Sequence, residues 1–355
     1  MEEIKLMLNE NPKPKVDSKE LGFGKIFTDN MFVMNYDVEK GWFDPRIVPF
    51  GPFQISPASL VLHYAPEIFE GMKAYRTDEG KVQFFRPTEN IKRMNISAER
   101  MCLPQIDEAF FMKALTTLVD IEQDWVPSAP YTSLYIRPFM FANDEMLGVH
   151  TPHQCVFAII LSPVGSYFKE GINPVKMMIE KEDVRASKGG TGFVKCGGNY
   201  AASLRAGERA ASKGYAQVLW LDAAERKYIE EGGGMNVMFK IDGTVVTPML
   251  NDSILPGITR KSILTILDSW NFPVEERLIS VDEVREAAKN GKLEECWCCG
   301  TAAVVSPIGE LSFGDENFII NDNKTGELTM KLYDALTDIQ WGKAPDNFGW
   351  IVPLK

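Results

Sequence analysis

The sequence contains little histidine and little cysteine for its length. Only three histidines, His63, His150 and His153, occur in 355 residues. This leaves little material for a histidine metal site, and we predict no bound metal. The six cysteines are few and partly clustered, unlike the disulfide framework of a small secreted protein. We therefore expect reduced thiols and a cytoplasmic protein.

The sequence also has fewer basic than acidic residues and no long apolar run. Lysine and arginine number 38 against 49 acidic residues, which gives a net charge of −11. Nucleic-acid binding needs a basic face, so we expect no nucleic-acid partner. The strongest apolar run, Cys155–Leu161, is far too short to span a bilayer, and the acidic start Met1–Lys5 is unlike a signal peptide. We expect no membrane partner.

The length and the order of the predicted elements favour a two-domain α+β protein. Strands and helices mix without a steady βαβ rhythm, which argues against a doubly wound sheet. Regularity fades after Ser162-Pro163-Val164-Gly165. The prediction is an N-terminal domain over 1–164, an interdomain loop over 165–175 and a second domain over 176–355. The predicted helices are Glu89–Arg100, Ile106–Asp124, Tyr200–Ser212, Ile258–Trp270 and Thr329–Trp341. Asp242-Gly243 predicts a hairpin turn between Asn236–Ile241 and Val245–Thr247.

A lysine and a glutamate beside glycine-rich segments indicate the chemistry. Lys195 lies between Val194 and Cys196-Gly197-Gly198, and an apolar setting can lower the pKa of an amine that acts as a nucleophile. The alternative is a solvated surface lysine. Glu231 precedes three glycines, which suggests that the backbone passes close to a ligand whose ring nitrogen the acid could hold. The alternative is a solvent-facing acid before a flexible loop.

Further segments supply weaker signals. Gly257-Ile258-Thr259 opens a predicted helix and could grip a phosphate, or simply initiate the helix. Gly300-Thr301-Ala302 is a small-residue turn that could bind a carboxylate, or be a tight turn and nothing more. Cys296 and Cys299 have CxxC spacing, which leaves a redox role possible, although we favour buried thiols. The Lys195 amine, the Glu231 carboxylate and a helix start that could grip a phosphate together predict a pyridoxal phosphate site.

The ordered motifs closely resemble the class IV pyridoxal phosphate aminotransferases. The resemblance runs through Glu231–Asn236, Thr247, Leu255 and Gly257–Arg260, with Met238 where an aromatic residue is usual. Within that class the chain looks like a branched-chain amino acid aminotransferase. Its landmarks run from Gly24–Asp29 to Ile339–Gly342, by way of Phe69–Ala74, Phe85–Pro87, Ser133–Pro138 and Lys195–Tyr200.

The resemblance implies a fold and a set of cofactor contacts. The fold would be fold type IV, with a small N-terminal α/β domain, a larger C-terminal one and the cofactor between them. Lys195 would bond covalently to pyridoxal phosphate and then move the substrate proton. Tyr200 would hydrogen-bond the phenolic oxygen of the cofactor, and Glu231 would pair with its pyridine nitrogen. The phosphate would be held by Arg86, Ile258, Thr259 and Thr301.

The resemblance also implies a substrate site and a reaction. The substrate carboxylate would meet Tyr135, Thr301 and Ala302, and Arg137 would bind the distal carboxylate of glutamate. The apolar side-chain pocket would contain Phe23, Phe69, Tyr64 and Tyr167, with Tyr64, Leu147 and Val149 contributed by the partner of a homodimer. The amino group of L-leucine, L-isoleucine or L-valine would pass to 2-oxoglutarate by a ping-pong mechanism. The Gly-Thr-Ala turn is followed by Ala303 and Ser306, where some relatives carry a CxxC redox pair.

Three alternatives remain open from the sequence. A D-amino acid aminotransferase and an aminodeoxychorismate lyase would share the fold and the cofactor roles, and only the substrate pocket would differ. A non-catalytic cofactor-binding protein on the same scaffold is the third, but the presence of both Lys195 and Glu231 argues against it.

Overall fold

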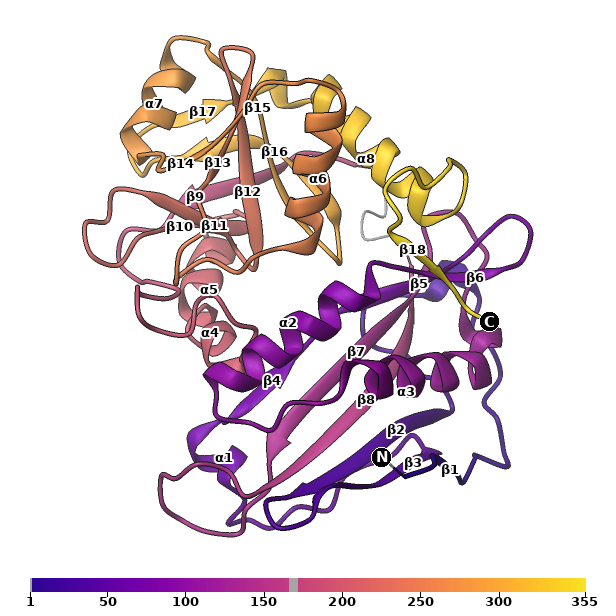
Figure 1. Ribbon diagram of the computed structural model, residues 1–355. Helices are drawn as coiled ribbons and strands as arrows, with labels where there is room; N and C mark the ends of the chain where they lie inside the picture. Colours follow the sequence, from indigo (N-terminus) through magenta and orange to yellow (C-terminus); the bar gives the residue numbers. More distant parts are fainter. Residues whose placement is uncertain (1, 166–171) are drawn as a thin grey trace. The chain divides into compact units, whose positions relative to one another are not determined.

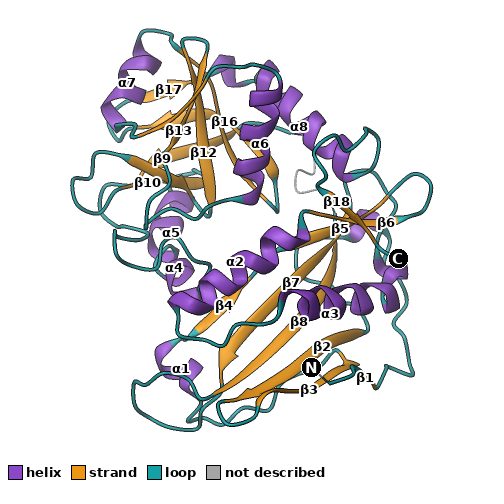
Figure 2. Ribbon diagram, viewed as in Figure 1, coloured by secondary structure: helices purple, strands orange, loops and turns teal. Residues whose placement is uncertain are grey.

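The computed structural model describes residues 2–165 and 172–355, and the chain divides into two compact units. Unit 1 comprises Met1–Tyr167, Val194–Gly197 and Ile339–Lys355, and unit 2 comprises Phe168–Phe193 and Gly198–Asp338. Each unit is a sheet with helices packed against it (Figure 1 and Figure 2).

The two compact units differ from the predicted division at 176 at two places. Val194–Gly197 belongs to unit 1 because Cys196 forms a β-bridge with Ile68 and the Lys195 carbonyl accepts the N–H of Phe69. The C-terminal segment also belongs to unit 1, because its last strand pairs with β6 (Val82–Phe85). As a result, the N-terminal unit is the larger of the two rather than the smaller.

Unit 1 is built on a nine-stranded, mainly antiparallel sheet in the order β1-β3-β2-β8-β7-β5-β6-β18, with β4 paired to β7. Its strands are β1 (Lys5–Leu6), β2 (Asn30–Asp37), β3 (Gly41–Pro49), β4 (Glu67–Phe69), β5 (Met72–Arg76), β6, β7 (Ser133–Ala142), β8 (Gln154–Val164) and β18 (Ile351–Pro353). Its helices are α1 (Leu60–Tyr64), α2 (Pro87–Arg100) and α3 (Glu108–Ile121), with 3₁₀ turns at Ser18–Glu20 and Gln123–Trp125.

Local chemistry explains where the two long helices of unit 1 begin. Proline occupies the first position of α2, where a missing N–H costs nothing. Asp107 caps α3 by accepting the N–H of Phe110 at 2.8 Å. The apolar stripe of α3, including Phe111 and Leu118, is buried, and α3 packs on β2. One part of the apolar core therefore lies between α3 and the sheet, and a second buried cluster includes Met31, Val33 and Phe141.

In unit 2, six strands close on themselves. The pairing runs β11-β10-β9-β16-β15-β12 and returns to β11, and β13, β14 and β17 extend it. The strands are β9 (Val175–Ile179), β10 (Gln217–Leu221), β11 (Ile229–Gly232), β12 (Met235–Ile241), β13 (Thr244–Pro248), β14 (Val274–Arg277), β15 (Leu293–Gly300), β16 (Val304–Ser312) and β17 (Asn317–Ile319). The remaining elements are α4 (Gly197–Ala201), α5 (Leu204–Ser212), α6 (Ile258–Ser269), α7 (Val281–Lys289), the 3₁₀ turn Asn321–Asn323 and α8 (Glu327–Gln340).

The hairpin predicted from Asp242-Gly243 is present between β12 and β13. Both residues have positive φ, 50° and 79°, as the favoured two-residue turn requires. The predicted helix 200–212 is divided into α4 and α5, because the chain turns at Ala202 and Ser203. Helices α5, α6 and α7 contact the strands of unit 2, and an apolar core including Leu219, Phe239 and Leu311 fills its interior. The α+β fold class is thus confirmed. Within the described residues, no helix has the length and apolarity needed to cross a membrane.

Candidate active site

Lys195 lies in a strand-like segment that docks beside β4. The Lys195 N–H donates to the Ser97 hydroxyl on α2 at 3.1 Å, and its carbonyl accepts the N–H of Phe69 at 3.0 Å. These two bonds fix the backbone on both sides of the side chain. The Lys195 amine lies over the Phe69 ring, 4.8 Å from the centroid. Burial, assisted by the positive charge of Arg93, lowers the pKa of Lys195 to about 8.

A buried ion pair stands next to this amine. Glu70 is fully buried and accepts hydrogen bonds from Arg93 Nε at 2.6 Å and Nη2 at 2.9 Å. Asn90 Nδ2 donates to the same carboxylate at 2.8 Å. Burial alone would raise the pKa of Glu70, but Arg93 and Asn90 outweigh it and the net pKa is below the usual value. Arg93 lowers the pKa of Lys195 and Glu70 raises it, so the effects of the two charges on the amine partly cancel.

The predicted substrate residues of β7 gather with two aromatic rings. Arg137 Nη2 donates to the Tyr135 hydroxyl at 3.0 Å, and the Arg137 guanidinium lies 4.5 Å from the centroid of the Phe69 ring. Phe23 meets Tyr135 edge-on at 4.9 Å. A Cβ at Gly71 would come within 2.1 Å of the Tyr135 hydroxyl, so any other residue there would have to displace that hydroxyl. Unit 1 thus brings together an amine, a guanidinium, a phenol and an apolar surface.

Arg86, predicted to hold the phosphate, is the residue that precedes α2. It has positive φ and ψ, 49° and 41°, a conformation that is uncommon for a side-chain-bearing residue and costs about 1–3 kcal/mol. Its guanidinium lies 5.0 Å from the ring centroid of Trp350 and 3.4 Å from Glu89. Trp350 also accepts the N–H of Arg86 through its carbonyl. The backbone conformation of Arg86 and the ring of Trp350 together fix the position of the guanidinium.

Three predicted pocket residues were assigned by the resemblance to the pocket of a partner subunit. Tyr64, Leu147 and Val149 are 47%, 68% and 82% exposed. Tyr167, the other predicted pocket residue, lies outside the described residues.

In unit 2, Glu231 is held at the end of the β11–β12 hairpin. It is 2% exposed and pairs in register with Asn236 across the hairpin. The Glu231 carboxylate accepts the Leu255 N–H at 3.0 Å and Asn236 Nδ2 at 3.3 Å, and it lies 2.6 Å from Arg185 Nε. A Cβ at Gly257 would come within 1.9 Å of Asn236 Oδ1, which accounts for this glycine in the motif. The solvent-facing alternative for Glu231 is therefore wrong.

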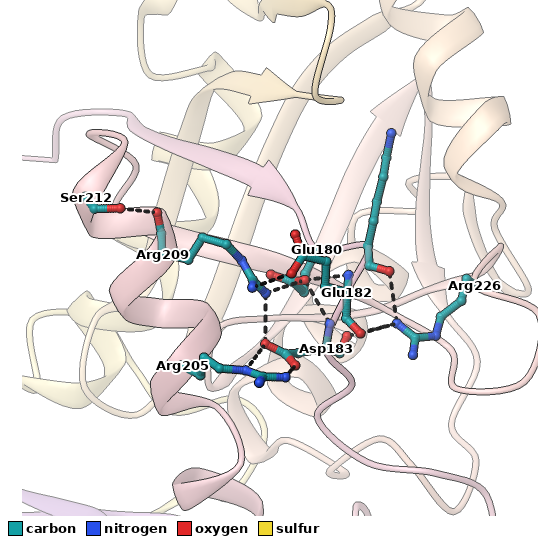
Figure 3. Close-up of polar contacts among 8 residues, drawn as sticks. Glu180, Glu182, Asp183, Arg205, Arg209, Ser212 and Arg226 are labelled. Carbon is teal, nitrogen blue, oxygen red and sulfur yellow. Dashed lines mark hydrogen bonds and ion pairs between the residues drawn. The ribbon is translucent and has the colours of Figure 1, made fainter.

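The segment that leads to Arg185 is itself clamped to α5. Arg209 contacts Glu180, Glu182 and Asp183, each at 2.8 Å, and Arg205 also pairs with Asp183 (Figure 3). Arg226 adds hydrogen bonds to three backbone carbonyls of the same segment. This network orients the loop from which Arg185 reaches Glu231. The glycines of that loop indicated Lys195 from the sequence. Arg185 was not predicted, because no local sequence pattern connects it with Glu231.

The remaining predicted cofactor residues of unit 2 lie at a helix start and a turn. Ile258 and Thr259 are buried and begin α6 directly after Gly257. The first N–H groups of a helix have no partner within the helix, so this end is suited to an anion. Thr301 and Ala302 form the β15–β16 turn, which ends in Val304 at φ 61°, a strained conformation for a β-branched residue. Tyr200, on α4, lies next to Gly234 of the β11–β12 hairpin.

The cysteines of β15 do not form a redox pair. Cys296 and Cys299 are three residues apart on one strand, so their side chains point to opposite faces and their Cα atoms are roughly 10 Å apart. That separation exceeds the limit of about 7 Å for a disulfide. Burial raises the pKa of Cys299 to about 12 and that of Cys296 well above its usual value. The preferred interpretation of buried thiols agrees with this geometry.

Comparison with known proteins places this arrangement in a family. The family model described as amino-transferase class IV matches residues 67–311, more than half of the chain. This chain belongs to the class IV aminotransferases. It is 54% identical to branched-chain-amino-acid aminotransferase 2 of Bacillus subtilis, over 98% of this chain and 96% of that protein. It is 52% identical to a probable branched-chain-amino-acid aminotransferase of Staphylococcus aureus, over 98% of both chains.

Solved structures agree with this family assignment. The branched-chain amino acid aminotransferase of Escherichia coli is similar with a TM-score of 0.77 and 25% identity, over 92% of this chain and 99% of that one. The branched-chain aminotransferase of the archaeon Thermoproteus uzoniensis, solved with norvaline, is similar with a TM-score of 0.76 and 25% identity, over 92% and 100%. The family resemblance inferred from the motifs is confirmed.

The described residues fit the cofactor of this family, pyridoxal phosphate. Lys195 would supply an amine of lowered pKa for the aldehyde, and the buried carboxylate of Glu231 would meet the pyridine nitrogen. Within unit 2, the start of α6 suits a phosphate. Within unit 1, the guanidinium of Arg86 is a cation of the kind that binds phosphate.

Proposed function

We propose that this protein is a branched-chain amino acid transaminase. It transfers the amino group of L-leucine, L-isoleucine or L-valine to 2-oxoglutarate by a ping-pong mechanism, giving the branched 2-oxo acid and L-glutamate. Relatives that carry this name are about half identical over nearly the full chain. The structural observation that carries the proposal is the Lys195 amine of lowered pKa beside Phe69, Tyr135 and Arg137 in unit 1.

Lys195 is the proposed catalytic base. When bound, pyridoxal phosphate supplies an electron sink for negative charge at the substrate Cα. With a pKa of about 8, the Lys195 amine is neutral near pH 7 far more often than a lysine of ordinary pKa, which is almost entirely protonated. Lys195 would hold the cofactor through its amine and, once released, would move the proton from the substrate Cα. Its pKa is near the working pH, which is where a general base is most effective.

The other proposed contacts orient the cofactor. Glu231, positioned by Arg185 and the Leu255 N–H, pairs with the pyridine nitrogen. Tyr200 hydrogen-bonds the phenolic oxygen. The phosphate is held by the following residues: Arg86, Ile258, Thr259 and Thr301.

The proposed substrate contacts explain how two kinds of side chain are accepted. The N–H groups of Thr301 and Ala302, with the Tyr135 hydroxyl, bind the carboxylate at Cα. Phe23 and Phe69 supply an apolar surface for leucine, isoleucine or valine. Arg137 lies against that surface, and its Nε is buried without a hydrogen-bond partner, so it can receive the distal carboxylate of 2-oxoglutarate.

We further propose a homodimer in the cytoplasm. Tyr64, Leu147 and Val149 are large and exposed, as expected of residues that contact a second copy of the chain and complete its apolar pocket. Tyr167 is proposed to join the same pocket. The composition, with few cysteines and an acidic balance, supports the compartment.

The proposal is tested by the visible absorption spectrum of the purified protein. A yellow cofactor band should bleach when L-leucine is added without an oxo acid, and it should return with 2-oxoglutarate. Bleaching by D-alanine but not by L-leucine would keep the cofactor and overturn the substrate. If no band formed even after pyridoxal phosphate was added, the assigned cofactor site would be wrong.

A further inference from the structure

Two of the three histidines of this chain meet one carboxylate at the base of a loop. The loop joins β7 to β8 and lies beside α1 (Figure 1), to which Asp144 is tied by the Leu60 N–H. His150 Nε2 lies 3.3 Å from Asp144 Oδ1, and His153 Nδ1 lies 3.9 Å from the same oxygen. The three candidate ligand atoms all lie within 4.8 Å of one another. The small number of histidines in the sequence predicted no metal site, but the fold brings two of them together beside Asp144.

Asp144 is held rigidly, with its charge directed at the histidines. It is 6% exposed, and its two oxygens accept the N–H of His153 at 2.9 Å and that of Gln154 at 3.2 Å. Both donors belong to the backbone, so the carboxylate cannot turn away. Its Oδ1 therefore stays in place between the two rings.

The hydrogen bonds of His150 leave a gap that a cation would fill. His150 Nδ1 lies 2.6 Å from the Gly148 carbonyl oxygen, which can only accept, so Nδ1 carries the hydrogen. In the neutral ring, Nε2 then presents a lone pair to Asp144 Oδ1 at 3.3 Å. Two acceptors at this distance repel unless a proton or a metal ion lies between them. A proton would join only His150 and Asp144, whereas a metal ion could also use His153 Nδ1, which lies 3.9 Å from the same oxygen.

The spacing and the ligand types indicate which ion. Tetrahedral zinc with bonds of about 2.0–2.1 Å places its ligands about 3.4 Å apart, close to the Asp144–His150 separation. The His153 side chain is 58% exposed, so its ring is free to turn inward. Two imidazoles with one carboxylate suit zinc and similar transition metals, whereas magnesium and calcium prefer oxygen ligands alone.

We propose that Asp144, His150 and His153 form a binding site for one divalent transition-metal ion of the zinc type. Water completes the coordination from the exposed side. The ion links the two ends of the loop that carries Leu147 and Val149 and so restricts its motion. An influence on substrate preference through Leu147 and Val149 rests on the proposed function, but the metal site itself does not.

Zinc titration of the tag-free holoenzyme by calorimetry tests the site. A Cys102→Ser background removes the exposed thiol, which could bind zinc on its own. We expect one zinc per chain, and His153→Gln should weaken binding roughly tenfold or more, since even outer-shell changes cost 10–100-fold. The control is His63→Gln, since His63 is likewise exposed and lies outside the cluster. Absence of zinc binding, or equal binding by wild type and His153→Gln, overturns the proposal.

A second measurement on the wild-type chain does not depend on a variant that folds. With three histidines there are three sets of imidazole NMR signals, and His63→Gln identifies one of them. Zinc should shift the signals of His150 and His153 and leave those of His63 in place. It should also slow hydrogen exchange over residues 145–150. If zinc shifts neither His150 nor His153, a proton alone occupies the gap and the metal site is refuted, whatever the transaminase activity.

Discussion

Replacing Glu70 with glutamine should destabilise unit 1 by several kcal/mol. The substitution keeps the volume but removes the negative charge, and it turns one acceptor oxygen into a donor facing Arg93 and Asn90. Arg93, which is 7% exposed, then keeps a buried charge without its partner. Removal of one member of a buried pair costs about 3–5 kcal/mol. With a urea m-value of about 2–3 kcal/mol/M, the unfolding midpoint of Glu70→Gln should fall by roughly 1–2 M.

The assay is urea unfolding at fixed protein and cofactor concentrations, since bound ligand adds stability of its own. The matched control is Glu79→Gln, which breaks an ion pair of similar length, 2.7 Å to Lys81, between two exposed side chains. Salt and water screen such a pair, so its loss should not move the midpoint. If both variants unfolded at the wild-type midpoint, the buried pair would not stabilise the unit.

The same substitution should change how stability depends on pH. The pKa of Glu70 is lower in the folded protein than its usual value of 4.5, so the folded state binds its proton less readily than the unfolded state does. The stabilisation is therefore present above about pH 4.5 and is lost as the pH falls through the folded pKa. Wild type should lose stability more steeply than Glu70→Gln over that acidic range.

Three further predictions concern the site itself. Lys195→Ala should lower turnover by at least about 10²–10⁴-fold, measured as glutamate formation, and full activity would refute the assigned base. In the apoprotein, the rate of pyridoxal phosphate capture should rise with pH as Lys195 loses its proton, with a midpoint near its pKa of about 8; a midpoint above 10 would contradict the burial argument. Gly71→Ala would place a methyl group 2.1 Å from the Tyr135 hydroxyl and should raise KM for the amino acid, whereas Gly207→Ala on α5 meets no atom within 4 Å and should leave KM unchanged.

Local sequence patterns predicted the elements whose causes are local. The hairpin at Asp242-Gly243 follows from two residues that adopt positive φ, and α2 follows from its helical spacing. The domain division was less accurate, because the return of Val194–Gly197 to unit 1 depends on pairing with β4, over a hundred residues earlier. Local propensity carries no information about such distant partners.

The residues of the candidate site also divide into those that a local motif predicted and those that it did not. Lys195, Glu231 and the glycines around them were predicted because their motif keeps the family's order and spacing along the chain. Glu70, Arg93 and Arg185 were not, although they contact or surround the predicted residues. A buried charge is identified by what surrounds it, and its neighbours come from other strands and helices.

The sequence alone therefore determined the family and its cofactor chemistry and proposed Lys195 as the reactive lysine, since these depend on residue types at fixed spacings. Only the tertiary structure decided the pKa of that lysine, because desolvation and neighbouring charges arise when distant segments pack. It also decided that Cys296 and Cys299 lie on opposite faces of a strand. Finally, it brought His150 and His153 to Asp144, because contact between side chains depends on their positions in space rather than on how many the chain contains.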